Sequence, residues 1–346
     1  MSEFSLNAAG LSGLSRLLSR ASDDAFDVLD YTKRQCDLGW RAEGLLMKLV
    51  GPHEHAYSTV TAALARVQDL SAGASGQVAL AAQDYAEADS AAARRLGPAY
   101  GIELTPMAQD FADVADPGAH LTDPGVVGSS PMWSINPLTD LISPASWVRQ
   151  VSITLFGYDP FDEWARDLGG DWAAYVHCGA AMSRAGAGAY EIGRNLLAGV
   201  SQAGAVWQGS AAEAERRFQT SLGTATETVN DACQEFSRLY GKAADAAANL
   251  RDVAGDLISD LLDALIMVNM ASAVGTALVE TGIGAIAGYG IAAYYATQAY
   301  QLYQEIARCY SVAGDTVEAL SAAIGSIHAD VDVPDLDAVQ PYRYAA

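Results

Sequence analysis

Apolar side chains recur at alternating steps of three and four residues over about fifty residues in the second half of this chain. This spacing keeps them on one face of a helix, and alanine fills many of the positions, so a partner helix can approach closely. A helix cannot bury such a face alone. The pattern therefore restricts the chain to a fold of long helices packed side by side, and its positions are Ala211, Ala214, Phe218, Leu222, Ala225, Val229, Ala232, Phe236, Tyr240, Ala243, Ala247, Leu250, Ala254, Leu257 and Leu261.

The composition agrees with a folded, helical chain and limits its partners. Apolar residues make up 51% and charged residues 18% of 346 positions, which excludes a mainly disordered chain. The 20 basic and 42 acidic residues give a net charge of −22. A chain this acidic repels phosphate backbones, so we expect no nucleic-acid partner. It also repels an anionic membrane surface unless apolar contacts compensate.

Residues 1–98 are predicted to form one long helical hairpin. Two apolar stripes with helical spacing are separated by Gly51-Pro52, which is the expected bend. Gly97-Pro98 is the expected end of the second arm. Neither arm can bury its stripe alone, so the arms must pack on each other or on another helix pair.

Residues 99–160 form a connector of a different kind. They hold seven of the 11 prolines, and prolines this frequent allow at most short helices. We expect this connector to pack along the bundle through its apolar residues, which are Phe111, Trp133, Leu138, Leu141 and Trp147. At the other end of the chain, residues 329–346 are acidic and are expected to be extended.

A second helical hairpin is predicted over residues 161–262, with its bend at Trp207-Gln208-Gly209. Glycine permits a tight bend between two helices, and tryptophan covers the end of a bundle with a large apolar surface. Without other signals, a core tryptophan at a helix turn is the better explanation of this motif.

A second short motif lies in the first hairpin. Tyr85 and Asp89 are four residues apart, so they share one face of a helix near its expected C-terminal end. An acidic residue there opposes the helix dipole, which indicates a role other than stability. A chance pairing of the two residues is the alternative.

Residues 263–328 are predicted to form a Gly/Ala-rich apolar hairpin followed by a last helix. Glu280 is the only charged residue between positions 264 and 304, and Gly284 and Gly288 have the spacing that allows close helix contact. Two interpretations stay open: a hairpin buried against the bundle, or a membrane-active or oligomer-forming element. The predicted fold is thus all-α, an elongated bundle with a four-helix core of two long hairpins and this additional hairpin.

No arrangement in the sequence indicates catalysis, a cofactor or a metal ion. His53-Glu54-His55 stands at an expected turn without a third ligand, so we expect it to be solvated. His177 and Cys178 are adjacent on a helix and point about 100° apart. The cysteines are expected to be small buried side chains, although a long-range disulfide stays open, and they are Cys36, Cys178, Cys233 and Cys309.

Taken together, the two short motifs resemble the substrates of actinobacterial type VII secretion. In the W-x-G helical-hairpin proteins and the PE/PPE pairs of that family, one partner supplies W-x-G and the other Y-x-x-x-[DE]. Residues 1–97 look like the Esp-type secreted helical proteins, above all over Ala79–Leu96. Residues 134–262 are similar to the enlarged W-x-G domain of type VII effectors, through Asn136-Pro137, Gly157-Tyr158-Asp159-Pro160, Gly170-Asp171-Trp172 and Trp207-Gln208-Gly209.

The resemblance implies a function in export without catalysis. Tyr85, Asp89, Trp207 and Gly209 would form a composite export signal that docks to the secretion ATPase or to a dedicated chaperone. The protein would be secreted or held at the cell surface, and no cleavable signal peptide is expected. The alternative is a secreted membrane-active, pore-forming or homo-oligomeric protein that acts through residues 264–304. An enzyme with an unrecognised helical site is a third reading, which a pocket of convergent polar groups would revive.

Overall fold

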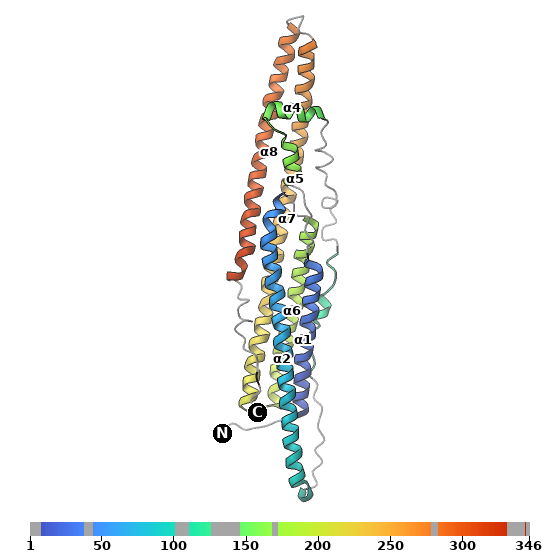
Figure 1. Ribbon diagram of the computed structural model, residues 1–346, viewed down its shortest axis with the longest axis vertical. Helices are drawn as coiled ribbons and strands as arrows, with labels where there is room; N and C mark the ends of the chain where they lie inside the picture. Colours follow the sequence, from blue (N-terminus) through green and yellow to red (C-terminus); the bar gives the residue numbers. More distant parts are fainter. Residues whose placement is uncertain are drawn as a thin grey trace.

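The computed structural model describes residues 8–37, 44–100, 111–125, 146–167, 172–277, 283–330 and 343. Every regular element in these ranges is helical, which confirms the all-α prediction, and the helices form an elongated bundle (Figure 1). The elements in chain order are α1 Ala8–Cys36, the 3₁₀ turn η1 Gly44–Leu46, α2 Met47–Tyr100, the 3₁₀ turn η2 Pro117–His120, α4 Ser146–Phe156, α5 Pro160–Asp167, α6 Trp172–Val206, α7 Ser210–Ala277 and α8 Ile283–Asp330.

One part of the molecule is a four-helix core in which α1 packs on α2, α6 on α7 and α1 on α6 (Figure 1). Two hydrogen bonds set the antiparallel register of α1 and α2. The Ser15 hydroxyl donates to the Ser75 carbonyl at 3.0 Å, and the Ser22 hydroxyl donates to the Gln68 carbonyl at 3.1 Å. The leucines of α1 are buried between the two helix pairs, as the apolar spacing requires.

Glycines on one face of α6 bring α6 and α7 into close contact. Gly179, Gly186 and Gly193 are seven residues apart, which is two turns of helix. A Cβ atom placed on Gly186 would lie 2.6 Å from the Cβ of Cys233 on α7. Real Cβ atoms do not approach this closely, so the separation of these two helices depends on the missing side chains.

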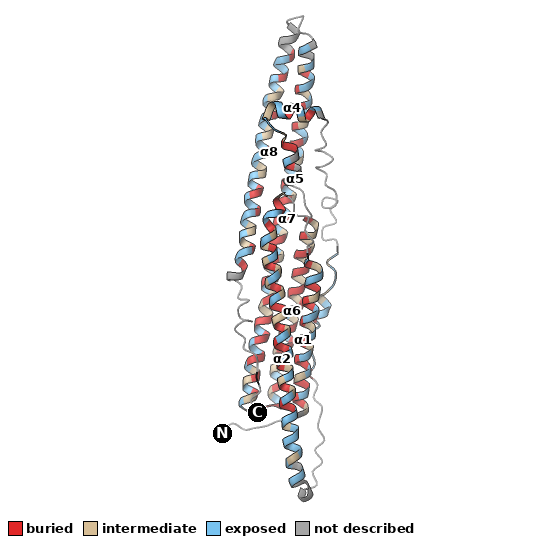
Figure 2. Cartoon of the chain, in the orientation of Figure 1, coloured by how far each residue is buried: buried red, intermediate tan, exposed pale blue. Residues whose placement is uncertain are grey.

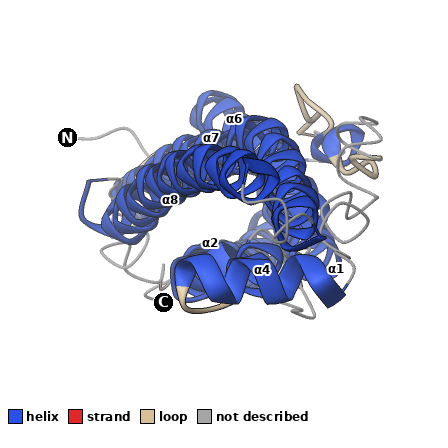
Figure 3. Cartoon of the chain, turned by 90° about the horizontal axis from the view of Figure 1, so that it is seen from above, coloured by secondary structure: helices blue, strands red, loops and turns tan. Residues whose placement is uncertain are grey.

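Helix α7 does not end with the four-helix core. Its 68 residues span about 100 Å at 1.5 Å per residue, so α7 extends beyond α1, α2 and α6 into the far part of the molecule (Figure 1). There α8 turns back and packs along it (Figures 1 and 3). The predicted separate hairpin over residues 263–328 is therefore wrong in detail, because its first arm is the end of α7.

The expected bend at Gly51-Pro52 lies inside a helix. Helix α2 begins directly after η1, at Met47, and continues through Pro52 and also through Pro98 to Tyr100. Proline has no N–H, so Pro52 cannot bond the carbonyl of Lys48 four residues before it. The Ser321 hydroxyl of α8 donates to that carbonyl at 2.9 Å instead. Packing against α8 thus removes one cost of a proline within α2.

Within the described ranges, the connector contacts the bundle through residues 111–125 and through α4. Near η2, the Asn195 side chain of α6 accepts hydrogen bonds from the backbone of Val114 and Ala115 and donates one to the Ala115 carbonyl, at 2.9–3.0 Å. Phe111 is buried, whereas Trp147 is 37% exposed, and Trp133, Leu138 and Leu141 lie outside the described residues.

Aromatic contacts hold α4 and α5 against α8. Trp164 of α5 stacks on Tyr310 of α8 with ring centroids 5.9 Å apart, and the Tyr158 and Tyr303 hydroxyls are 2.7 Å apart. Figure 1 shows α4 lying across the α7–α8 pair. Each large aromatic side chain buries more apolar surface than an alanine does. A few aromatic contacts can therefore hold these two short helices in place although the contact area is small.

Candidate functional site

The turn between α6 and α7 contains the predicted W-x-G motif. The Trp207 N–H continues the helical pattern by donating to the Ala203 carbonyl at 3.0 Å. Gly209 has a φ of 121°, a conformation that side-chain-bearing residues rarely adopt, and its carbonyl accepts from the Glu213 N–H at 3.0 Å. The glycine is therefore required by the backbone, and α7 begins directly after it.

The Trp207 side chain points into the bundle and is 1% exposed. It closes the end of the four-helix core, as a large apolar surface at this position would be expected to do. Gln208 is exposed and Gly209 is half-buried. Of the three motif residues, only Gln208 and the backbone of Gly209 are thus open to a partner.

Beneath this turn lies a polar group that the sequence analysis missed. Glu215 of α7 is fully buried, and within the described part of the chain neither of its carboxyl oxygens has a hydrogen-bond partner. Burial raises the pKa of this carboxyl to about 8, against a small opposing effect of Arg216. Glu215 is therefore uncharged at neutral pH. Its position three residues before Phe218 on the apolar stripe was the available sequence signal.

Tyr85 and Asp89 lie on α2. Tyr85 is half-buried and packs against the hydrophobic core, whereas Asp89 is exposed. Because α2 continues to Tyr100, Asp89 is about three turns from the helix end, too far for the helix dipole to disfavour its charge. Beyond Tyr85, most of the α2 surface is exposed, and Figure 2 shows this end projecting from the core.

The helix registers bring the two motifs to the same level of the bundle. Gly10 of α1 packs so closely on Val206 that a Cβ on Gly10 would lie 2.6 Å from the Val206 Cβ. Extending the α1–α2 register of Ser15 and Ser75 puts Tyr85 beyond Gly10, level with the W-x-G turn. The pairing of His53 with Tyr240 across antiparallel α2 and α7 leads to the same level independently.

The residues predicted for a helix-packing or membrane element lie far from that turn. Gly284 and Gly288 belong to the start of α8, and Gly288 is buried. Glu280 lies outside the described residues. Along the described helices, none has the length and apolar character that a membrane span needs. The far part of the α7–α8 pair nevertheless exposes large apolar side chains, namely Ile266, Met270, Tyr289, Ile291 and Tyr294.

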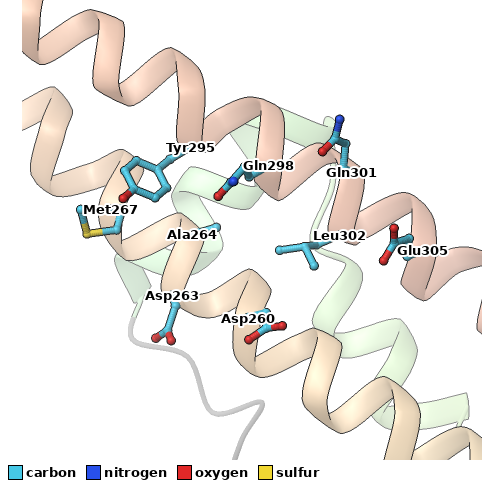
Figure 4. A pocket seen from close by; sticks show the side chains of 9 residues that line it. All are labelled: Asp260, Asp263, Ala264, Met267, Tyr295, Gln298, Gln301, Leu302 and Glu305. Atoms are coloured by element: carbon cyan, nitrogen blue, oxygen red, sulfur yellow. The ribbon is translucent and has the colours of Figure 1, made fainter.

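A groove with a volume of about 390 Å³ lies between α7 and α8 (Figure 4). Three carboxylates line it, from Asp260, Asp263 and Glu305. Over the ranges that the structure describes, no group of three or more histidine, cysteine, aspartate or glutamate residues is arranged to hold a metal ion. The groove is an acidic, open surface between two helices.

His53 was expected to be solvated, and this expectation is wrong. Its ring is 3% exposed, and Nδ1 lies 2.9 Å from the Tyr240 hydroxyl in the middle of the core. Burial lowers the pKa of His53 to about 4, so the ring is neutral at physiological pH. The error follows from the misplaced bend, because residues just after a turn are usually exposed and His53 is within α2.

His177 does not pair with the neighbouring Cys178. Its ring lies 2.8 Å from the Gln35 side chain and 3.2 Å from the Gly125 carbonyl, both outside α6. The sequence analysis had put these two adjacent side chains in different directions, and the contacts agree.

The chain matches no protein-family model, no curated protein and no solved structure.

Proposed function

We propose that this chain is a substrate of a type VII secretion system and that its export signal is composite. The signal consists of the W-x-G turn at Trp207 and Gly209 and of the Tyr85 and Asp89 pair on α2. The supporting observation is the common axial level of these two motifs, which the register of α2 against α1 and its pairing with α7 give independently.

The burial of the motif residues suggests a different role for each of them. Trp207 is in the core, so its role is to hold the turn closed and keep α6, α7 and α1 together at this end. Gly209 supplies the backbone conformation that lets α7 begin. The surface offered to a partner is then the exposed Gln208 and the projecting end of α2 with Asp89.

That surface suits a protein partner that binds a helix end. The projecting part of α2 is accessible on nearly all sides, since few of its residues contact the core. Its acidic residues Asp84, Glu87 and Asp89 come before the basic Arg94 and Arg95. A secretion ATPase or a dedicated chaperone could place basic residues opposite the acidic ones and acidic residues opposite the basic ones. These charges would attract the partner to α2 and fix its orientation on the helix.

The test is export from an actinobacterium with intact type VII machinery. Tyr85→Ala, Asp89→Ala and Trp207→Ala are compared with the unmodified chain and with Asp69→Ala, which removes an exposed aspartate of α2 remote from the turn. We expect the three motif variants to stay in the cells and Asp69→Ala to be exported like the unmodified chain. Circular dichroism of the purified variants controls for folding.

Two results would contradict the proposal. One is export of the folded Asp89→Ala and Tyr85→Ala variants at the unmodified level. The other is retention of the unmodified chain itself. Because Asp89 is exposed, its replacement leaves the fold intact and gives the decisive comparison.

A membrane-active or oligomeric role after export is the second candidate. It is favoured by the exposed apolar side chains of the far α7–α8 pair, where Met270 and Tyr294 are 58% and 59% exposed. Leakage of a dye from vesicles of anionic and neutral lipids measures this activity. Met270→Ser and Tyr294→Ser should reduce leakage, whereas Val312→Ser, farther along α8, should not. No leakage from the unmodified chain would exclude membrane activity.

A further inference from the structure

Four helices contribute one residue each to a polar cluster in the middle of the hydrophobic core. Cys36 comes from α1, His53 from α2, Cys178 from α6 and Tyr240 from α7. All four are buried. The His53 Nδ1 lies 2.9 Å from the Tyr240 hydroxyl and 3.9 Å from the Cys178 sulfur. Polar side chains so deep in a core require partners, and here they supply them to one another.

The two cysteines of this cluster are in contact across α1 and α6. The Cys36 thiol donates to the Cys178 carbonyl at 3.7 Å. Both cysteines are free. Of the other cysteines, Cys233 of α7 packs under Gly186, and Cys309 is half-buried on α8.

The two cysteines belong to different helix pairs of the four-helix core. Cys36 ends the first helix of the pair α1–α2, and Cys178 lies in the helix pair α6–α7. A covalent bond between them would close a loop from position 36 to position 178 and fix the two pairs to each other. The contact belongs to the packing of α1 on α6.

We propose that Cys36 and Cys178 are a site of oxidative cross-linking, which forms a disulfide when the reduced chain meets a low-molecular-weight disulfide. One thiol loses its proton and attacks the reagent's S–S bond, which leaves a mixed disulfide and releases one thiolate. The second cysteine loses its proton, attacks the protein sulfur of the mixed disulfide and releases the other thiolate. Two cysteines are oxidised, the reagent is reduced to two thiols, and these take up both protons.

The surroundings of the pair determine when this reaction runs. Burial raises the pKa of the Cys178 thiol, and the neighbouring Cys36 raises it further, so little thiolate exists in the folded chain. A reagent also has no path to a fully buried sulfur. The cross-link therefore forms while the chain folds in the presence of the disulfide reagent, and the folded, reduced chain reacts slowly.

The experiment is refolding of the full chain from denaturant, with oxidised glutathione in one sample and reduced glutathione in the other. Peptide mapping without reduction should give one linked pair, containing Cys36 and Cys178, that is two hydrogens lighter than the free peptides. The loop closed is long, so the oxidised chain should unfold about 10 °C higher than the reduced one. The already folded, reduced chain should keep its thiols for hours in the same oxidant.

Two variants separate this pair from the other cysteines. Cys178→Ala should remove both the linked peptide and the shift in unfolding temperature, whereas Cys309→Ala, the matched control, should keep both. Cys36→Ala repeats the test from the other side should Cys178→Ala fold poorly. Four free thiols after oxidative refolding, a link to Cys233 instead, or an oxidised chain without the helical circular dichroism of the reduced one would overturn the proposal. None of these readouts depends on export.

Discussion

The Ser321 hydroxyl of α8 donates a hydrogen bond of 2.9 Å to the carbonyl of Lys48, the group that Pro52 leaves without a donor within α2. Beside it, the Lys48 ammonium lies 3.1 Å from a Glu318 carboxylate oxygen and 3.3 Å from the Gly314 carbonyl. A position that looks like a helix break in the sequence is thus the place where α8 attaches to α2.

This relationship predicts a coupling between Pro52 and Ser321. Ser321→Ala should lower the free energy of unfolding by about 1 kcal/mol, because it leaves the Lys48 carbonyl without a protein donor. In a Pro52→Ala background the same replacement should cost close to nothing, since the substituted alanine would restore the helical N–H. Urea unfolding of the two single variants and the double variant measures the coupling, and equal costs of Ser321→Ala in both backgrounds would contradict it.

The close contact of α6 and α7 predicts opposite effects for two glycine replacements. A Cβ on Gly193 would lie 2.7 Å from the Gly223 carbonyl oxygen, a backbone atom that cannot move aside. Gly193→Ala should therefore destabilise the chain by about 1–3 kcal/mol. Gly241 of α7 has open space around its Cβ position, so Gly241→Ala should stabilise it by about 0.5–1 kcal/mol through helix propensity. Thermal unfolding followed by circular dichroism compares them, and equal signs would contradict the packing argument.

Glu215 predicts a loss of stability as the pH rises. Its folded-state pKa of about 8 lies above the unfolded value of 4.5, so the folded chain holds this proton more tightly. The resulting stability is full below pH 4.5 and is lost as the pH rises through 8, and it amounts to about 3–5 kcal/mol. Glu215→Gln should remove this slope and unfold at higher denaturant than the unmodified chain at pH 8.5. Parallel pH profiles of the two proteins would disprove the assignment.

His53 predicts the opposite dependence at lower pH. Its pKa of about 4 in the folded chain is below the unfolded value of 6.5, so the unfolded chain takes up the proton first. The contribution is complete above pH 6.5 and is lost as the pH falls towards 4, by about 2–3 kcal/mol. His53→Gln should flatten the difference in unfolding free energy between pH 7 and pH 4, measured by urea unfolding. His120, whose side chain is 40% exposed, provides the histidine control.

Much of the candidate site follows from local patterns. The turn at Trp207 and Gly209 and the pairing of Tyr85 with Asp89 on one helix face could be read directly, because each depends on residues close in sequence. The burial of Glu215 and of His53 could not. A charged or polar side chain on an apolar stripe points either to solvent or into the core, and only the neighbouring helices decide which.

The sequence by itself determined that the chain is all-α, because three- and four-residue spacing over long stretches permits no other packed structure. It also determined where α6 turns into α7, since only Gly209 tolerates the backbone conformation found there. Tertiary structure alone decided that α2 runs through Pro52, that α7 continues past the four-helix core, and that Cys36 meets Cys178. These outcomes depend on contacts between residues far apart in the chain. Such contacts offset the local cost of a residue such as Pro52, which in the sequence alone predicts the end of a helix.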